Sequence, residues 1–269
     1  MLTVSASLAR YARLYAAFLR LHFKRLAEYR GDFVIGAVAL IISQTAGLLF
    51  IWVIFTRIKS LAGWNVFEVT LLYGLATGAG SLARLLFSNL WSLGTTFVRR
   101  GDLLRLLIRP VNPLFHLIAE HFEEEAIGGL ALALALVGHA LTGLGMATEL
   151  WRWAVAILTM VFGAFIIGGI NLAVASLSFW MVDSAPLMWA VSNFSRFARY
   201  PLGAYHRAVR FIVTWILPYG AVTFYPAHLI SGRGDAWSWL ATPGAAAAVC
   251  LVAYRLWLAG LRRFEGVGS

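Results

Sequence analysis

The feature that most constrains this chain is its long apolar runs, which are separated by short segments that carry arginine. A helix needs about 20 apolar residues to cross a bilayer. Charged residues make up 13% of the 269 residues, whereas about a quarter is usual in a soluble domain. A single soluble core could not hide so much apolar surface. The sequence therefore predicts an all-α integral membrane protein.

The clearest predicted spans cover residues 33–55, 67–90, 126–147, 153–177 and 237–258. Within the second of these, Gly74 and Gly78 lie four positions apart. Small residues at this spacing let two helix backbones approach closely. We therefore expect both glycines to mark helix packing.

The remaining crossing has two candidates. Residues 211–230 are apolar enough, but Pro218 and Pro226 interrupt them, and proline removes a backbone donor and clashes with the preceding helical turn. A broken segment of this kind can instead be a re-entrant hairpin buried in protein, in which case the shorter segment 185–198 crosses. Both alternatives give six transmembrane helices with both termini in the cytoplasm, and the count of arginine and lysine favours 211–230.

Residues 1–32 have the pattern of an amphipathic helix. Its aromatic and aliphatic face comprises Leu8, Tyr11, Tyr15, Phe18, Leu26 and Tyr29. The opposite face is basic and includes Arg13, Arg20 and Lys24. This division is typical of a helix that lies in the headgroup layer, and the alternative is an ordinary helix packed on another protein segment.

A loop over residues 91–125 is basic at first and acidic at its end. We expect a helix of about two turns within it, because Asp102 can cap its first amides and Pro110 disfavours helix at the residue before it. So short a helix is unstable alone in water, and its leucines and Ile108 are too apolar for a free loop. It should therefore pack against the membrane or against a partner, with Arg105 and Arg109 pairing with carboxylates of that partner.

Patterns for catalysis and metal binding are lacking in the sequence. His139 stands alone in its span, and neither Lys24 nor Lys59 follows a glycine-rich phosphate loop. The net charge of +10 fits arginines facing anionic lipid headgroups better than it fits nucleic acid. We therefore expect no catalytic residue, no metal site and no nucleic-acid partner in this chain.

The order of these features resembles the membrane subunit of ATP-binding-cassette (ABC) exporters of the ABC type-2 class. More narrowly, it is similar to bacterial permeases of this class that lack a fused ATPase. The residues that carry the resemblance are Tyr29 to Phe33, Gly101 to Pro110 with Pro113, Ser178 to Trp180, Tyr200-Pro201, Leu217-Pro218-Tyr219, Tyr225-Pro226-Ala227 and the tail Arg263 to Ser269.

The resemblance implies a transmembrane domain over residues 33–269 that follows the interfacial helix 1–32. It implies that the loop 91–125 holds a coupling helix, whose contact residues would be Gly101, Asp102, Leu104, Arg105, Leu107, Arg109 and Pro110. It also implies a re-entrant helical hairpin over residues 199–233 on the outer side, which favours 185–198 as the fifth crossing. The residues that mark this hairpin would be Tyr200, Pro201, Pro218, Tyr219, Tyr225 and Pro226.

The implied partners are a second permease, identical or paralogous, and two copies of a separate ABC ATPase. The ATPase would bind ATP and magnesium, so this chain would hold no cofactor. The implied location is the bacterial inner membrane, and export is the favoured direction because the loop motif of importers is absent. A cavity among Leu, Phe, Ala and Gly would suit a lipid or other amphiphile.

Two other function classes remain open on the sequence. An intramembrane acyl- or glycosyl-transferase would need His139 as its polar residue, so replacing this histidine should abolish its activity. A secondary transporter would work without ATP and would stop when the proton or sodium gradient collapses.

Overall fold

The computed structural model describes residues 2–28, 30–181 and 183–264, with the backbone alone at 2–9, 12, 23 and 25–27. Tyr29, the side chains of Leu8 and Leu26, and the tail 265–269 therefore lie outside the described part. Within that part the fold is helical and has no β-strand beyond one isolated bridge, Leu61 to Trp64.

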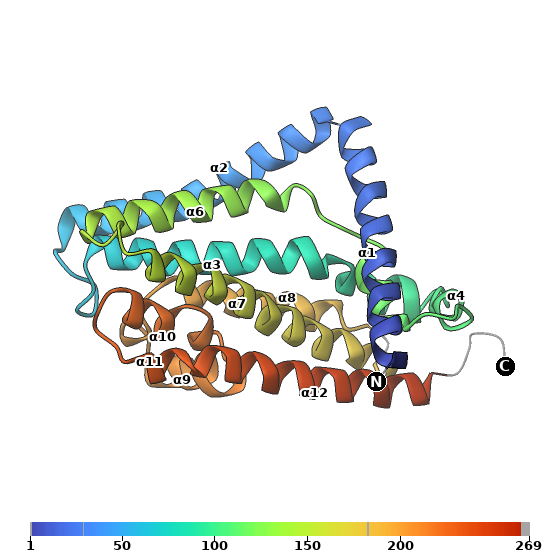
Figure 1. The fold of residues 1–269 in the computed structure, drawn as a ribbon. Coiled ribbons are helices and arrows are strands. Elements are labelled where there is room, and N and C mark those ends of the chain that lie inside the picture. The colour runs from blue at the N-terminus through green and yellow to red at the C-terminus, as the bar shows by residue number, and fades with distance from the viewer. Residues whose placement is uncertain (1, 29, 182, 265–269) are drawn as a thin grey trace.

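The long helices are α1 (Leu2–Glu28), α2 (Arg30–Arg57), α3 (Val66–Phe87), α6 (Ala126–Gly143), α7 (Leu150–Ser176) and α12 (Ala241–Arg263). Helices α2, α3, α6, α7 and α12 run along one bundle, and α1 lies across one end of it (Figure 1). Five helical segments in the described residues are long and apolar enough to cross a membrane, and they are Arg30–Arg57, Val66–Val98, Ala126–Gly143, Leu150–Phe179 and Ala236–Arg263.

Shorter helical elements occupy both ends of the bundle and one of its sides. They are η1 (Ser88–Trp91), η2 (Leu93–Val98), α4 (Leu103–Leu107), α5 (Pro113–Ala119), η3 (Leu177–Phe179), α8 (Ala185–Phe194), η4 (Ser195–Arg199), η5 (Leu202–Ala204), α9 (Arg207–Phe211), η6 (Ile212–Ile216), α10 (Gly220–Ile230) and α11 (Ala236–Trp239). We call the end that carries α4 the α4 end. The opposite end, where residues 58–65 join α2 to α3, is the loop end (Figure 1).

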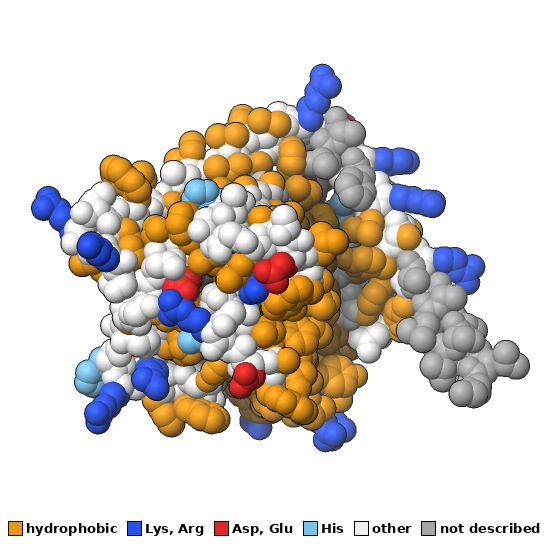
Figure 2. All heavy atoms as spheres, turned by 60° about the vertical axis from the view of Figure 1, so that its left-hand side comes forward, with side chains coloured by type: hydrophobic (Ala, Val, Ile, Leu, Met, Phe, Trp, Pro, Cys, Tyr) orange, Lys and Arg blue, Asp and Glu red, His pale blue; other side chains and the backbone are white. Residues whose placement is uncertain are grey.

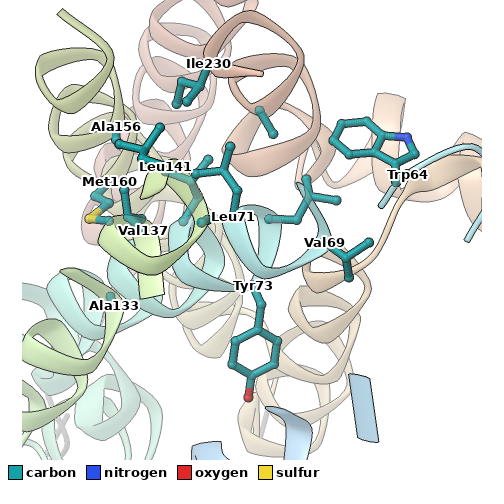
Figure 3. Close-up of a cluster of buried hydrophobic side chains, with 14 of the residues drawn as sticks. Trp64, Val69, Leu71, Tyr73, Ala133, Val137, Leu141, Ala156, Met160 and Ile230 are labelled. Carbon is teal, nitrogen blue, oxygen red and sulfur yellow. The ribbon is translucent and has the colours of Figure 1, made fainter. Parts of the chain in front are cut away.

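Helix α3 lies at the centre of the bundle between α6 and α7. Leu71 on α3 is buried in one cluster with Val137 of α6 and Met160 of α7. Figure 3 shows side chains from these helices meeting, whereas Tyr73 points away from them. Gly74 faces α6, because an added Cβ would lie 3.2 Å from the Cβ of Leu136. Gly78 faces α7, because an added Cβ would lie 2.8 Å from Cγ of Met160.

The ends of three predicted spans differ from the observed helix ends by four residues or more, and one of them is that of α12, which ends at Arg263 and not at residue 258. Helical structure after α3 continues through η1 and η2 to Val98, so it extends beyond the expected end at residue 90. Helix α6 ends at Gly143, before the expected residue 147. Gly145 has a φ of 72°, a left-handed conformation that glycine adopts readily and that commonly follows the end of a helix.

Residues 185–199, which form α8 and η4, run from the α4 end toward the loop end. Met188 is buried in one cluster with Leu103 and Trp257 at the α4 end. Arg199 donates to the hydroxyl of Tyr73, 3.3 Å away, on the first half of α3. This segment therefore passes along the bundle although α8 itself has only ten residues.

The proline-broken segment after it has a different course. Residues Arg207–Ile216 and Gly220–Ile230 form two arms bent by 96°. Before the first arm, an added Cβ on Gly203 would lie 3.3 Å from the Cβ of Ala62, which belongs to the loop end. After the second arm, Arg233 donates to the carbonyl of Gly63 at 2.8 Å. The two arms therefore begin and end at the same end of the bundle.

Candidate functional site

The α4 segment, residues 101–110, is the first of two candidate functional regions. Gly101 has a φ of 81°, which turns the chain before α4. Leu103 and Leu106 are fully buried in the cluster that contains Leu117 and Trp257. On the opposite side, the described part of the chain leaves three apolar side chains exposed, and they are Leu104 (42%), Leu107 (39%) and Ile108 (83%).

Helix α4 begins where the sequence predicts, but the expected capping hydrogen bond and the expected end of the helix are wrong. Asp102 stands at the N-cap position but its side chain makes no capping hydrogen bond. Its φ of −60° and ψ of −17° are helical, whereas side-chain capping requires a non-helical backbone at that position. Helix α4 also ends at Leu107, short of Pro110, and a turn closed by Val111 N–H donating to the carbonyl of Arg109 at 2.8 Å follows it.

Both arginines of the α4 segment contact side chains of the same loop. Arg105 lies 3.1 Å from a carboxylate oxygen of Glu120, and both side chains are partly exposed. Arg109 Nη1 lies 2.7 Å from Nε2 of His116. Burial lowers the pKa of His116 below its ordinary value of 6.5, and the neighbouring Arg109 lowers it further. Pairing with a partner's carboxylates would have to replace or extend these contacts.

The aromatic face of α1 packs on α5 and on the connection before it. The ring of Tyr11 lies 4.9 Å from that of Phe115, and the ring of Phe18 lies 5.4 Å from that of His116. Arg10 donates to the carbonyl of Pro110 at 3.2 Å. The sequence left open whether this face meets lipid or protein, and the structure places part of it against the chain's own loop.

The second candidate region is a cavity of about 610 Å³ between α2, α3, α7 and α8. Its lining is Leu40, Gln44, Ala76, Thr77, Gly80, Ser81, Ala83, Arg84, Phe87, Ser88, Trp91, Ser92, His121, Glu123, Ile167, Asn171, Trp189, Ser192, Ser195, Arg199 and Tyr219. Arg84 and Glu123 form an ion pair in this lining. Arg199 lies farther toward the loop end, and its guanidinium carbon is 5.1 Å from the ring centre of Tyr73.

Sequence reasoning did not find this cavity, because its lining comes from segments that are far apart in the chain. Two lining residues are arginines in or next to predicted spans, Arg84 in 67–90 and Arg199 after 185–198, but these positions alone do not indicate a shared cavity. Of the residues expected to mark the hairpin, Tyr219 lines the cavity. Tyr200 lies elsewhere, with its ring 6.1 Å from that of Phe50.

Pro201 stands immediately before η5. Pro218 stands at the bend between the two arms. Pro226 lies inside α10 and next to Tyr225, and it does not end that helix. The expectation that this proline marks a helix end is therefore wrong. Pro226 is the seventh residue of α10, so it lacks the N–H that would bond to the carbonyl of Val222, and the helix nevertheless continues to Ile230.

The described residues contain no group of three or more His, Cys, Asp or Glu that could hold a metal ion. His139 is exposed, and its ring centre lies 5.7 Å from that of Phe67.

A family model described as ABC-2 family transporter protein matches residues 41–268 of the chain. Neither the curated proteins nor the solved structures contain a match.

Proposed function

This chain belongs to the ABC-2 transporter family, and from that premise we propose that it is the permease subunit of an ABC exporter. A separate ATPase subunit would hydrolyse the ATP and bind its magnesium. The observation that carries this proposal is the exposed apolar surface of Leu104, Leu107 and Ile108 at the α4 end of the bundle.

The geometry of the α4 segment suits a coupling element. Leu103 and Leu106 hold its inner side in the protein core, so a push on its outer side would reach α5, η2 and α12. Its outer side presents clustered apolar side chains, and an exposed apolar cluster of this kind typically marks a binding surface. We propose that this surface binds in a groove of an ABC ATPase. Two copies of the ATPase would then bind two permease subunits.

We further propose that the α4 end faces the cytoplasm of a bacterial inner membrane. Both α1 and the end of α12 lie at this end (Figure 1), so both termini would be cytoplasmic and α1 would be interfacial. Segment 185–199 would be the fifth crossing and α12 the sixth. The two arms bent by 96° would be a re-entrant hairpin from the outer side, because both their ends lie at the loop end.

Pairing with a second permease, identical or paralogous, is supported by the surface of α2. Ile35, Ile42 and Trp52 are each about two-thirds exposed, and this helix contacts mainly α6 and α3. Figure 2 shows hydrophobic side chains over large parts of one face, with basic side chains mostly around its edge and a few acidic and basic ones within it. Lipid and a second copy would cover such surface, and an amphiphilic substrate would move between the subunits.

The test compares two isoleucine substitutions at opposite ends of the bundle. Ile108→Asp should abolish co-purification of the ATPase with the tagged permease and ATP-dependent transport in membrane vesicles. Ile58→Asp is the matched control, because Ile58 is also exposed but lies at the loop end. Normal ATPase binding and transport by the Ile108→Asp variant would overturn the assignment, and transport that persists without ATP would favour a secondary transporter.

A further inference from the structure

The cavity between α2, α3, α7 and α8 contains a cation without an acidic partner. None of the ion pairs among the described residues involves Arg199. Its guanidinium instead donates to the hydroxyl of Tyr73 at 3.3 Å and faces the ring of that residue. The other arginine of the lining, Arg84, is already paired with Glu123. The lining therefore carries an excess positive charge that is located at Arg199.

A buried hydroxyl of the same cavity lining also lacks a partner. Thr77 lines the cavity, is 2% exposed, and its Oγ1 has no hydrogen-bond partner among the described residues. It lies one helical turn beyond Tyr73 on α3, so both residues share one face of the helix. A second hydroxyl of the lining, Ser88 Oγ, is buried and unpartnered as well. Buried polar groups are normally hydrogen-bonded, so these two hydroxyls keep unused hydrogen-bonding capacity beside the cavity.

One part of the rest of the lining is apolar and aromatic, and the other part carries the polar side chains of Gln44, Ser81, Ser92, His121, Asn171, Ser192 and Ser195. Trp91 and Trp189 lie edge to face with ring centres 5.3 Å apart, and Leu40, Phe87 and Ile167 complete this part. The volume of about 610 Å³ is in the range of cavities that enclose a drug-sized ligand. The cavity thus combines one uncompensated cation and unpartnered hydroxyls with an apolar wall.

We propose that this cavity binds an amphiphile whose anionic group, a phosphate or a carboxylate, contacts Arg199 and the hydroxyl of Thr77. The apolar part of the ligand lies along Trp91 and Trp189. This inference rests on the proposed transport function and names the substrate class of the same permease. A charged side chain at membrane depth is costly and commonly marks a substrate path, which gives Arg199 a physical reason to be there.

The test measures binding to the purified full chain in a neutral maltoside detergent by native mass spectrometry. The probes are dodecyl phosphate, dodecylphosphocholine and inorganic phosphate. Dodecyl phosphate should bind about tenfold or more tightly than either other probe, because only it offers both an uncompensated anion and an alkyl chain. Equal affinity for the two dodecyl compounds would contradict the role of the ligand's negative charge. Equally tight binding of inorganic phosphate would contradict the proposal that the ligand is an amphiphile.

Matched variants assign the binding to named side chains. Arg199→Gln should remove the preference for dodecyl phosphate, and Arg199→Lys should keep most of it. Thr77→Val should weaken binding severalfold with little change in volume. Arg196→Gln is the control, because Arg196 is on the same short helix but is exposed and does not line this cavity. Equal losses in Arg199→Gln and Arg196→Gln would overturn the inference.

Size-exclusion profiles identical to the wild type show that the variants are folded. Co-purification of the ATPase with the wild-type chain is measured separately. A chain that binds its ATPase but does not prefer dodecyl phosphate would keep the transport proposal and contradict this inference. A chain that prefers dodecyl phosphate but has no ATPase partner would support this inference and contradict the transport proposal.

Discussion

Arg233 Nε lies 2.8 Å from a carboxylate oxygen of Glu68, so the chain just beyond α10 is tied to the first turn of α3. Glu68 is 2% exposed and also accepts from the backbone N–H of Asn65 at 2.8 Å. Asn65 in turn accepts from the N–H of Glu68, which completes a capping box. An ion pair between residues far apart in sequence therefore holds the loop end together.

We predict that Arg233→Gln destabilises the protein more than Glu68→Gln does. Removing Arg233 leaves the buried carboxylate of Glu68 without its cation, and because Arg233 itself is 41% exposed we expect a loss of about 2–3 kcal/mol. Removing the charge of Glu68 leaves Arg233 partly in water, and Gln can still accept from Asn65, so we expect a loss of about 1–2 kcal/mol. Thermal unfolding in detergent measures both, and a larger effect of Glu68→Gln would contradict the prediction.

The close approach of α6 to α2 predicts that two glycine-to-alanine substitutions differ in how much they destabilise the protein. A Cβ added to Gly128 would lie 3.1 Å from both Cα and the carbonyl oxygen of Ala37, so the helices themselves must move. A Cβ added to Gly78 meets the flexible end of Met160, which can shift. We expect Gly128→Ala to cost about 1–3 kcal/mol and Gly78→Ala less than about 1 kcal/mol. Similar unfolding temperatures for the two variants would contradict this prediction, because they would show that α6 and α2 move apart at Gly128 with little loss of stability.

Variants of the Arg105–Glu120 pair can show whether Arg105 contacts the ATPase directly or only positions α4 through Glu120. We expect Arg105→Glu to weaken ATPase association, because it places two carboxylates side by side and loosens α4 from α5, although its effect on stability should stay below about 1 kcal/mol at this exposed site. The double variant Arg105→Glu with Glu120→Arg should restore the pair and the association. If the double variant binds the ATPase as poorly as the single one, Arg105 contacts the ATPase itself.

His116 should make docking of α5 depend on pH. Burial and Arg109 lower its pKa in the folded loop below 6.5, while Glu120 acts in the opposite direction. Below pH 6.5 the unfolded loop therefore binds more protons than the folded one, so stability is full above that pH and falls as the pH drops toward the folded pKa. The protection factors of α5 amides, which are corrected for the slower intrinsic exchange at low pH, should fall from pH 7 to pH 5. His116→Gln should remove this dependence on pH, and an unchanged profile would contradict it.

Much of the helical order could be predicted because it depends on local composition. The apolar runs at 33–55 and 153–177 correspond to α2 and α7, since length and hydropathy suffice for a membrane helix. The N-cap role of Asp102 was wrong because the backbone before α4 is already helical. The cavity could not be predicted, since Gln44, Thr77 and Arg199 come together only when α2, α3 and η4 pack.

By itself, the sequence determined the class of the protein and the places of its long apolar helices, because burying apolar side chains in lipid depends on segment length and not on neighbours. Only the tertiary structure decided the course of segments 185–199 and 207–230. The bend at residues 217–219 contacts another segment, because the hydroxyl of Tyr219 donates to the carbonyl of Val191 at 3.3 Å. A proline breaks a helix, but the direction in which the chain continues depends on what its freed backbone and side chains contact.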